Sequence, residues 1–380
     1  MSRLEAHKKD LYELRFSPMC KPAAEVANLT QLESHSTRAR TMMMWRIVEG
    51  YLDWGEREVE LLYESTLDSI SEAFDVFHYP ISQYMLAARA DVWEAGLAPA
   101  IVNNVVELDF NLPLSEPPLT SGSTDLLLAL GGELVHNENS SMLASLQDAL
   151  KSSGVDAAVW QTSTGALAYT LGARGIARKQ AVRVVEGIES SGAKRIVADG
   201  PETAWALNKV YPSLGVNLPE DVEVKLLAEV LDSQRLNTNA LPGKVFVHDS
   251  RAACLIADTM PSHLVIMPGY RKSEEAFGSG AVYEAARKLV DASGAERLFG
   301  TWSRGLAKSC GADDGLWLTH PDLATGLARQ RLDYARQLGA EIIVTDSPLS
   351  AQWLDKNSID GDARVCWLPE LFTLGNKVSG

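Results

Sequence analysis

Two stretches of the chain, GAKRIVADGPETAWAL (residues 192–207) and GAEIIVTDSPLSAQWL (residues 339–354), align with each other without a gap. They share Gly-Ala, Ile-Val, Asp, Pro, Ala and the final Leu, and Gly192 and Gly339 stand 147 positions apart. Any strand followed by a helix shares apolar residues, but Gly, Asp and Pro in register as well indicate an internal repeat. We therefore predict a duplicated unit of strand, polar turn and helix.

Further matching segments surround the two stretches. STGA at Ser163 and SCGA at Ser309 precede them, and GIAR at Gly175 and GLAR at Gly326 lie between. Each copy opens with an apolar run, TDLLLALGG in one and GKVFVHDS in the other. Strands that alternate with helices predict a parallel sheet covered on both faces, and ligands of such sheets bind beyond the carboxyl ends of the strands.

Two linker-like stretches rich in Pro, Gly, Ser, Thr and Asn, 108–124 and 232–243, divide the chain into three parts. In the first part, TRARTMMMWRIVEGYLDWG and EREVELLYESTLDSISEAF carry apolar residues at helical spacing. The predicted fold is therefore α/β. A helical domain (1–110) is followed by two duplicated α/β domains (124–240 and 244–380) with parallel sheets.

Composition excludes several classes of function. Among 380 residues, 35 Lys and Arg stand against 50 Asp and Glu, which gives a formal charge of −15 and a pI near 5.0. This balance argues against a nucleic-acid partner, because phosphates are bound by clustered cations. The N-terminal residues lack the apolar stretch of a signal peptide, and no run is long enough to span a membrane. We expect a cytoplasmic protein whose four cysteines form no disulfide framework.

In this order, the segments resemble the iron–sulfur oxidoreductases typified by the glycolate oxidase iron–sulfur subunit, the anaerobic glycerol-3-phosphate dehydrogenase C subunit and heterodisulfide reductase subunits. SCGADDGLWLTHPDLATGLARQRLDYARQLGAEIIVTDSP resembles the family's stretch from its CCG motif to its closing CxxC, and VFVHDSRAAC resembles its HDPC-type strand end. TRARTMMMWRIVEG and AARADVWEAGLAP resemble helices of the family's first domain. The resemblance implies a ferredoxin-like helical domain, with two four-iron clusters in the family, and two CCG-type cysteine-rich repeats.

Most cysteines that bind clusters in the family are missing from this chain. Of eighteen positions, only two are cysteine and seven are serine, whose hydroxyl is a poor ligand for iron. We expect a degenerate member without clusters and without another cofactor. The positions are Leu14, Ser17, Cys20 and Ala24 for the first cluster; Ser65, Asp68, Ser71 and Asp75 for the second; Gly132, Ser163, Thr164, Gly200 and Thr203 in the first repeat; and Arg251, Ser309, Cys310, Ser347 and Ser350 in the second.

Two functions are compatible with these losses. Family members usually work beside a flavin-containing dehydrogenase, so the resemblance implies a scaffold or partner subunit that binds such a flavin dehydrogenase or an intact iron–sulfur paralogue. The alternative is a small-molecule enzyme or binding protein that uses a cleft between the repeats, with Arg251 as an anchor for an anion. This candidate cleft is formed by His248, Asp249, Arg251, Cys310, Asp346, Ser347 and Ser350.

Several residues carry a chemical interpretation beside a structural one. The four positions of the second cluster have the oxygen atoms of a metal site, but Ser and Asp are also common in loops, and we predict no metal. Cys310 near Lys308 suggests a reactive thiol, although a relic without function is favoured. His248 and Asp249 suggest acid–base chemistry or, more simply, a structural turn. We expect Met42 to Met44 to pack in a core, as we do Cys254 and Cys366.

Overall fold

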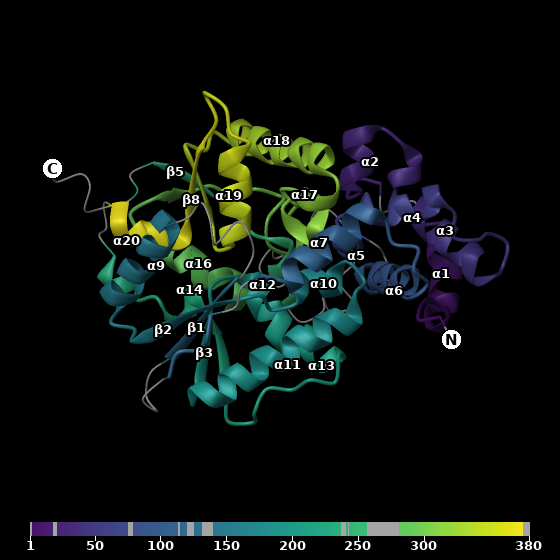
Figure 1. Cartoon of the computed structure of the whole chain (residues 1–380). Coiled ribbons are helices and arrows are strands. Elements are labelled where there is room, and N and C mark those ends of the chain that lie inside the picture. The colour runs from purple at the N-terminus through teal and green to yellow at the C-terminus, as the bar shows by residue number, and fades with distance from the viewer. Residues whose placement is uncertain are drawn as a thin grey trace.

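A computed structural model gives the arrangement of the chain (Figure 1). It contains helices and parallel strands, so the α/β class expected from the sequence is confirmed. Among the residues it describes, no helix is long and apolar enough to cross a bilayer. The described residues are 2–17, 21–74, 79–112, 115–119, 125–130, 140–236, 241, 243–256 and 281–374.

The N-terminal segment consists of helices on one side of the molecule (Figure 1), and the described residues before Asp125 contain no strand. Its longest helix, α6, is buried over most of its length, which is why Met85 and Ala88 are inaccessible to solvent. The helices are α1 (Lys8–Leu14), α2 (Glu25–Thr30), α3 (Thr37–Val48), α4 (Glu56–Tyr63), α5 (Ser69–Phe74), α6 (Ile81–Glu94) and α7 (Ala100–Phe110).

Two four-stranded parallel sheets follow, with the same strand order. The strand order is β2-β1-β3-β4 in the first sheet and β6-β5-β7-β8 in the second. The first, second, third and fourth strands of each repeat therefore occupy the same positions in their sheets. β6 is much shorter than β2. The strands are β1 (Asp125–Leu130), β2 (Ala157–Thr162), β3 (Arg195–Ala198), β4 (Glu223–Leu226), β5 (Lys244–His248), β6 (Glu296–Arg297), β7 (Ile342–Thr345) and β8 (Arg364–Trp367).

The aligned stretches form the same helix–strand–helix element in both sheets. Gly192 and Gly339 have φ of +74° and +78° and end the preceding helices, because a left-handed backbone suits glycine. Pro201 and Pro348 start the next helices, where no hydrogen-bonded N–H is needed. The helices of the first repeat are α9 (Ser140–Ser153), α10 (Ala166–Thr170), α11 (Arg174–Ser191), α12 (Pro201–Trp205), α13 (Tyr211–Ser213) and α14 (Leu227–Val230); those of the second are α15 (Arg251–Ile256), α16 (Ala281–Ala292), α17 (Leu316–Thr319), α18 (Pro321–Gln337), α19 (Pro348–Lys356) and α20 (Leu371–Leu374).

The glycines of STGA and SCGA have a common structural role. Gly165 and Gly311 both have positive φ, and each lies against the backbone of a helix. If Gly165 had a Cβ, this atom would stand 3.0 Å from the backbone oxygen of Ala177. A Cβ at Gly311 would stand 2.3 Å from the backbone oxygen of Ala324. Only glycine permits this approach, so the repeated motif fixes how each turn packs on α11 or α18.

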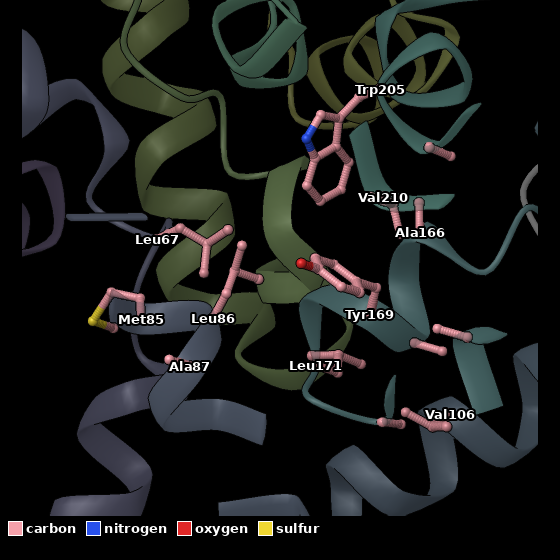
Figure 2. Close-up of a cluster of buried hydrophobic side chains, with 14 of the residues drawn as sticks. Leu67, Met85, Leu86, Ala87, Val106, Ala166, Tyr169, Leu171, Trp205 and Val210 are labelled. Atoms are coloured by element: carbon pink, nitrogen blue, oxygen red, sulfur yellow. The ribbon is translucent and has the colours of Figure 1, made fainter. Parts of the chain in front are cut away.

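Two hydrophobic cores cross the boundaries between the three parts. One joins the N-terminal helices to the first repeat, and Figure 2 shows Leu86 of α6 and Tyr169 of α10 in this core. The other joins the second repeat to α2 and α9. Met43 and Met44 lie in the first core with 8% and 0% exposure, so their predicted packing is confirmed, whereas Met42 is only partly buried and belongs to neither core. The repeats and the N-terminal helices therefore share apolar interiors.

Candidate functional site

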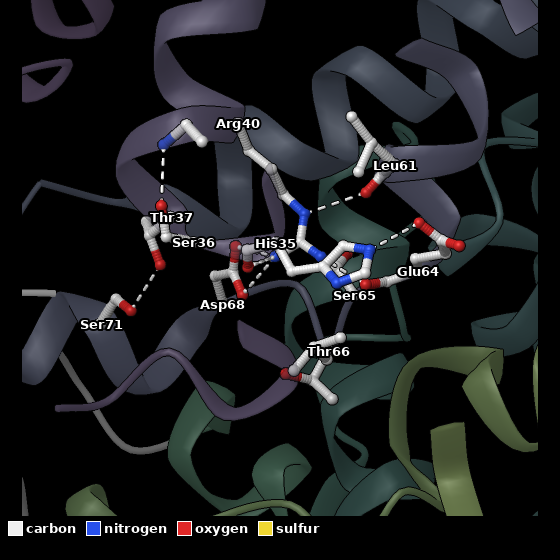
Figure 3. Close-up of polar contacts among 12 residues, drawn as sticks. His35, Ser36, Thr37, Arg40, Leu61, Glu64, Ser65, Thr66, Asp68 and Ser71 are labelled. Atoms are coloured by element: carbon white, nitrogen blue, oxygen red, sulfur yellow. Dashed lines mark hydrogen bonds and ion pairs between the residues drawn. The ribbon is translucent and has the colours of Figure 1, made fainter. Parts of the chain in front are cut away.

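The positions of the second family cluster lie in a buried polar network (Figure 3). Asp68 is 2% exposed and forms an ion pair of 2.9 Å with Arg40 of α3. Ser71 Oγ lies 2.7 Å from Thr37 Oγ1, and Ser65 Oγ accepts from Arg89 of α6 at 3.1 Å. Asp75 lies outside the described residues. Around the three described positions, where the resemblance implies thiolates and iron, the structure has two arginines and their hydrogen-bond acceptors.

Two of the four positions predicted for the first cluster, Leu14 and Ala24, are buried apolar residues. Leu14 ends α1 and Ala24 precedes α2, with exposures of 2% and 1%. The backbone N–H of Ser17 donates to the Leu14 oxygen at 2.9 Å, which forms a turn, and Cys20 lies outside the described residues. Glu25 stands where the family has proline, and its carboxylate accepts from Thr66 Oγ1 at 2.8 Å. Leu14 and Ala24 have no atom that ligates a metal.

Hydroxyl groups at four cluster positions of the repeats donate hydrogen bonds to carboxylates. Each has a carboxylate oxygen within 3.0 Å, and one of these bonds crosses from the second repeat to the first. A bond of this kind is stronger when the carboxyl is ionised than when it is protonated. The four are Ser163 Oγ to Asp109 at 3.0 Å, Thr203 Oγ1 to Asp199 at 2.6 Å, Ser309 Oγ to Asp313 at 2.6 Å and Ser347 Oγ to Glu202 at 2.7 Å.

Four further repeat positions serve the backbone or carry no side chain. Thr164 Oγ1 accepts from the Ala166 N–H at 3.4 Å, and the Ser350 N–H donates to Ser347 Oγ at 3.0 Å as part of the cap of α19. Gly200 caps α12. It lies close to Pro348 of the other repeat, because a Cβ at this position would stand 2.7 Å from the Pro348 ring. Gly132 lies outside the described residues.

Arg251 does not face a cleft between the repeats, contrary to its predicted role as an anion anchor. Its side chain is 2% exposed and points toward the N-terminal helices, where Nε donates to Ser69 Oγ at 2.9 Å. Nη1 donates to the Ala307 oxygen at 2.8 Å and to Cys254 Sγ at 3.2 Å. These bonds tie the second repeat to α5, so the guanidinium acts as an internal connector.

The pair His248 and Asp249 is engaged by arginines. Arg331 Nε donates to His248 Nδ1 at 2.9 Å, and burial followed by the charge of Arg331 lowers the pKa of His248 well below its ordinary value. Arg287 donates two 2.8 Å bonds to the Asp249 carboxylate. Burial alone would raise the pKa of Asp249, but the charge and hydrogen bonds of Arg287, the Arg304 N–H and His248 together lower the pKa. These contacts support the structural interpretation of the pair.

Of the three described cysteines, Cys310 and Cys366 are shielded from solvent. Cys310 has no exposure, and burial followed by the nearby Asp313 raises the pKa of its thiol to about 12. Thiolate is the nucleophilic form, so Cys310 is a poor nucleophile at neutral pH. Cys366 is 1% exposed within the second core, as expected, whereas Cys254 is partly exposed and has a pKa raised by burial.

A cavity of about 140 Å³ lies between the two repeats and α7, beside the predicted cleft. None of the seven predicted cleft residues lines it; their neighbours do. Most of the wall is apolar, and four acidic side chains interrupt it. The apolar wall includes Val105, Leu108, Leu167, Trp205, Leu255 and Trp317, and the acidic side chains are Asp109, Glu202, Asp313 and Asp314.

The carboxyl groups around this inter-repeat cavity hold their protons more tightly than usual. Burial and then the charge of Asp313 raise the pKa of Glu202 to about 8. Burial also raises the pKa of Asp109, Asp313 and Asp314. Nearby Asp346 has a pKa of about 7, raised by burial and by Asp249. Such shifts are frequent in functional sites but also occur in structural networks.

Two other features were not predicted. A second cavity of about 300 Å³ is lined by Lys308, Arg331 and Glu25, and the Lys308 ammonium lies 4.0 Å from the Trp302 ring centroid. A group formed by Glu60, Glu64 and His320 has its potential metal-ligand atoms within 4.8 Å of one another. The spacing of Glu60 and Glu64 places both on one helix face, but nothing local indicates that His320 joins them. Glu64 already pairs with Arg57 and His35.

Comparison with protein-family models and with curated proteins finds no match for this chain. Among solved structures, the chain is similar to a hypothetical protein from Helicobacter pylori, with a TM-score of 0.61 and 12% sequence identity over 98% of this chain and 75% of that one. At this identity the likeness extends to the fold alone.

Proposed function

We propose that this chain is a cluster-free relative of the iron–sulfur oxidoreductases that acts as a scaffold or partner subunit beside a flavin dehydrogenase or an intact iron–sulfur paralogue. The observation that carries the proposal is the chemistry at the family's ligand positions. In the described part of the chain, most of these positions are hydroxyls that bond to carboxylates, to other side chains or to the backbone. Asp68 pairs with Arg40, Arg251 bonds internally, Leu14 and Ala24 are apolar, and Cys310 is a buried cysteine. A domain built in this way transfers no electrons through iron.

An exposed aromatic patch on the N-terminal helices supports a protein partner. Tyr12, Phe16 and Tyr51 are 52%, 65% and 66% exposed, and the partly buried Trp45 lies between Tyr12 and Tyr51 with ring centroids 5.9 Å from each. The Arg15 guanidinium stacks 3.4 Å from the Tyr12 ring centroid. Aromatic residues and arginine are enriched at protein interfaces.

Anaerobic reconstitution of the full chain with iron and sulfide tests the absence of clusters. We expect no stoichiometric iron or acid-labile sulfide, with an intact ferredoxin treated in parallel as the positive control. A reproducible four-iron EPR signal after reduction would contradict the proposal.

Affinity purification from the native source tests the partner. We expect a flavin-containing dehydrogenase to co-purify with the wild-type chain and to be lost with Phe16→Ser. Ile359→Ser is the matched control, because Ile359 is 62% exposed but lies in the second repeat. Recovery of the chain without any flavoprotein, or equal recovery with both variants, would count against this use of the patch.

A second candidate function is small-molecule binding, and one observation favours it: the mostly apolar cavity at the junction of the repeats. Ligands of parallel sheets bind beyond the carboxyl ends of their strands, and the residues that follow β2, β3 and β7 contribute to this cavity through Ser163, Glu202 and Pro348.

A further inference from the structure

We infer that the inter-repeat cavity binds a small organic cation, with an ammonium group on an apolar body about the size of one aromatic ring. This inference gives the ligand class for the second candidate function and rests on the cavity alone. It is independent of whether the chain has a protein partner.

The ionisable side chains of the cavity wall are all acidic. Asp109, Glu202, Asp313 and Asp314 line the cavity, and no Lys, Arg or His is among the described residues of its wall. An anion entering this space would meet four acidic groups and no counter-charge. A cation would find carboxyl groups there that can accept its hydrogen bonds and balance its charge.

Two of the four acidic side chains have an oxygen without a partner. Asp109 accepts from Ser163 and Gln180, and Asp313 accepts from Ser309 and from the Arg251 N–H. Glu202 Oε2 and Asp314 Oδ2 are shielded from water and have no hydrogen-bond partner within the described chain. Buried polar atoms without a partner are rare and costly, which points to a missing donor.

The arginines near these carboxyls are occupied by other acceptors. Arg89 approaches Asp314 only through the backbone oxygen, at 3.3 Å, and otherwise donates to the oxygens of Leu62, Ser65 and Thr170. Arg251 donates through its side chain to Ser69 and Ala307. Neither guanidinium donates to the unbonded oxygens of Glu202 or Asp314. An ammonium group of a ligand could therefore donate to these oxygens without displacing a side chain of the protein.

The apolar wall sets the size of the ligand. A volume of about 140 Å³ compares with the roughly 150 Å³ of an engineered apolar cavity that holds benzene. Trp205 and Trp317 line the space, and indole faces attract cations. The cavity therefore suits a ligand with one amine and one aromatic ring better than a ligand that is polar throughout or that carries several amines.

Isothermal titration of the full chain at about pH 9 with three probes of similar shape tests the inference: 2-phenylethylamine, 2-phenylethanol and 3-phenylpropanoate. At this pH Glu202, whose pKa is about 8, is ionised, and a primary amine with a pKa near the roughly 10.4 of lysine keeps its charge. We expect the amine to bind roughly tenfold or more tightly than the alcohol, because a hydrogen bond to a charged group is worth about 1.5–3 kcal/mol. The carboxylate should bind least. Equal or tighter binding of the carboxylate, or no measurable binding of any probe, would overturn the inference.

Variants locate the site. Glu202→Gln should weaken the amine roughly tenfold and leave the alcohol almost unchanged, since only the charged contact is removed. Glu186→Gln makes the same chemical change at an exposed position of α11 and should leave both affinities as in the wild type. Amine affinity that is unaffected by Glu202→Gln would place the ligand elsewhere and refute the assignment. The ranking of the probes on the wild-type chain remains decisive if a variant fails to fold. Neither result depends on iron or on a co-purifying protein.

Discussion

The N-terminal helices and the junction of the repeats both contain polar positions where the proposed family resemblance implies cluster thiolates, but the two regions differ in how charge is balanced. In the N-terminal network, Arg40 pairs with Asp68 at 2.9 Å and also donates to the Leu61 oxygen. At the junction, Glu202 has a hydroxyl donor on one oxygen and nothing on the other. In the first region the carboxylate is paired with a guanidinium, whereas in the second several carboxyl groups gather and one oxygen of Glu202 has no hydrogen-bond donor. The first is therefore suited to stability and the second to binding.

The buried pair gives the largest expected effect. Arg40→Met leaves Asp68 charged, buried and without its partner, and we expect a loss of about 3–5 kcal/mol in the free energy of unfolding. Arg3→Met breaks the exposed ion pair with Glu94 and should cost less than about 1 kcal/mol. Urea denaturation followed by circular dichroism measures both. If the two variants lose equal stability, the N-terminal network is not the satisfied, charge-paired region described above.

The unpaired carboxyls of the junction predict that stability falls as pH rises. The pKa of Glu202 is about 8 in the folded chain against an ordinary 4.5, so the folded state holds a proton that the unfolded state has released over this range. Its stabilisation is complete below about pH 4.5 and is lost as pH passes through 8. The slope reaches about 1.4 kcal/mol per pH unit for this group. The raised pKa of Asp346, about 7, acts in the same direction.

Denaturation series from about pH 5 to about pH 8 measure this slope. Glu202→Gln should flatten it, while Glu186→Gln should not, because only the first variant removes a titrating group from the junction. A wild-type chain whose stability is constant or increases over this range would mean that the carboxyls of the junction are compensated in solution.

The features that sequence reasoning recovered are those encoded locally. Gly339 and Pro348 end one helix and start another through their own backbone preferences, so the repeat and the parallel strands could be predicted from neighbouring residues. The direction of Arg251 could not, because its acceptor Ser69 belongs to a helix 182 positions earlier in the chain. Glu202 was missed for a similar reason. An acidic residue in the first turn of a helix is common at exposed sites, and only the tertiary contact with Ser347 makes it a buried group.

The smallest expected effects separate two kinds of hydroxyl bond. Ser347→Ala removes the donor to Glu202 and leaves both oxygens of a buried carboxyl without a partner, so we expect a loss of about 1–3 kcal/mol. Ser71→Ala removes a neutral bond of 2.7 Å to Thr37, whose hydroxyl also lies in a buried network, and should cost about 1 kcal/mol.

The two serine variants are matched, because both side chains have no exposure and both lose a single oxygen atom. Chemical denaturation at about pH 6 compares them, and the same series at about pH 9 adds a second criterion. Ser347→Ala should be more destabilising at the higher pH, because Glu202, whose pKa is about 8, has then lost its proton and its charge has no donor, whereas Ser71→Ala should be indifferent to pH. An identical pH response from both variants would mean that Ser347 stabilises α19 through its cap with Ser350 rather than the charge of Glu202.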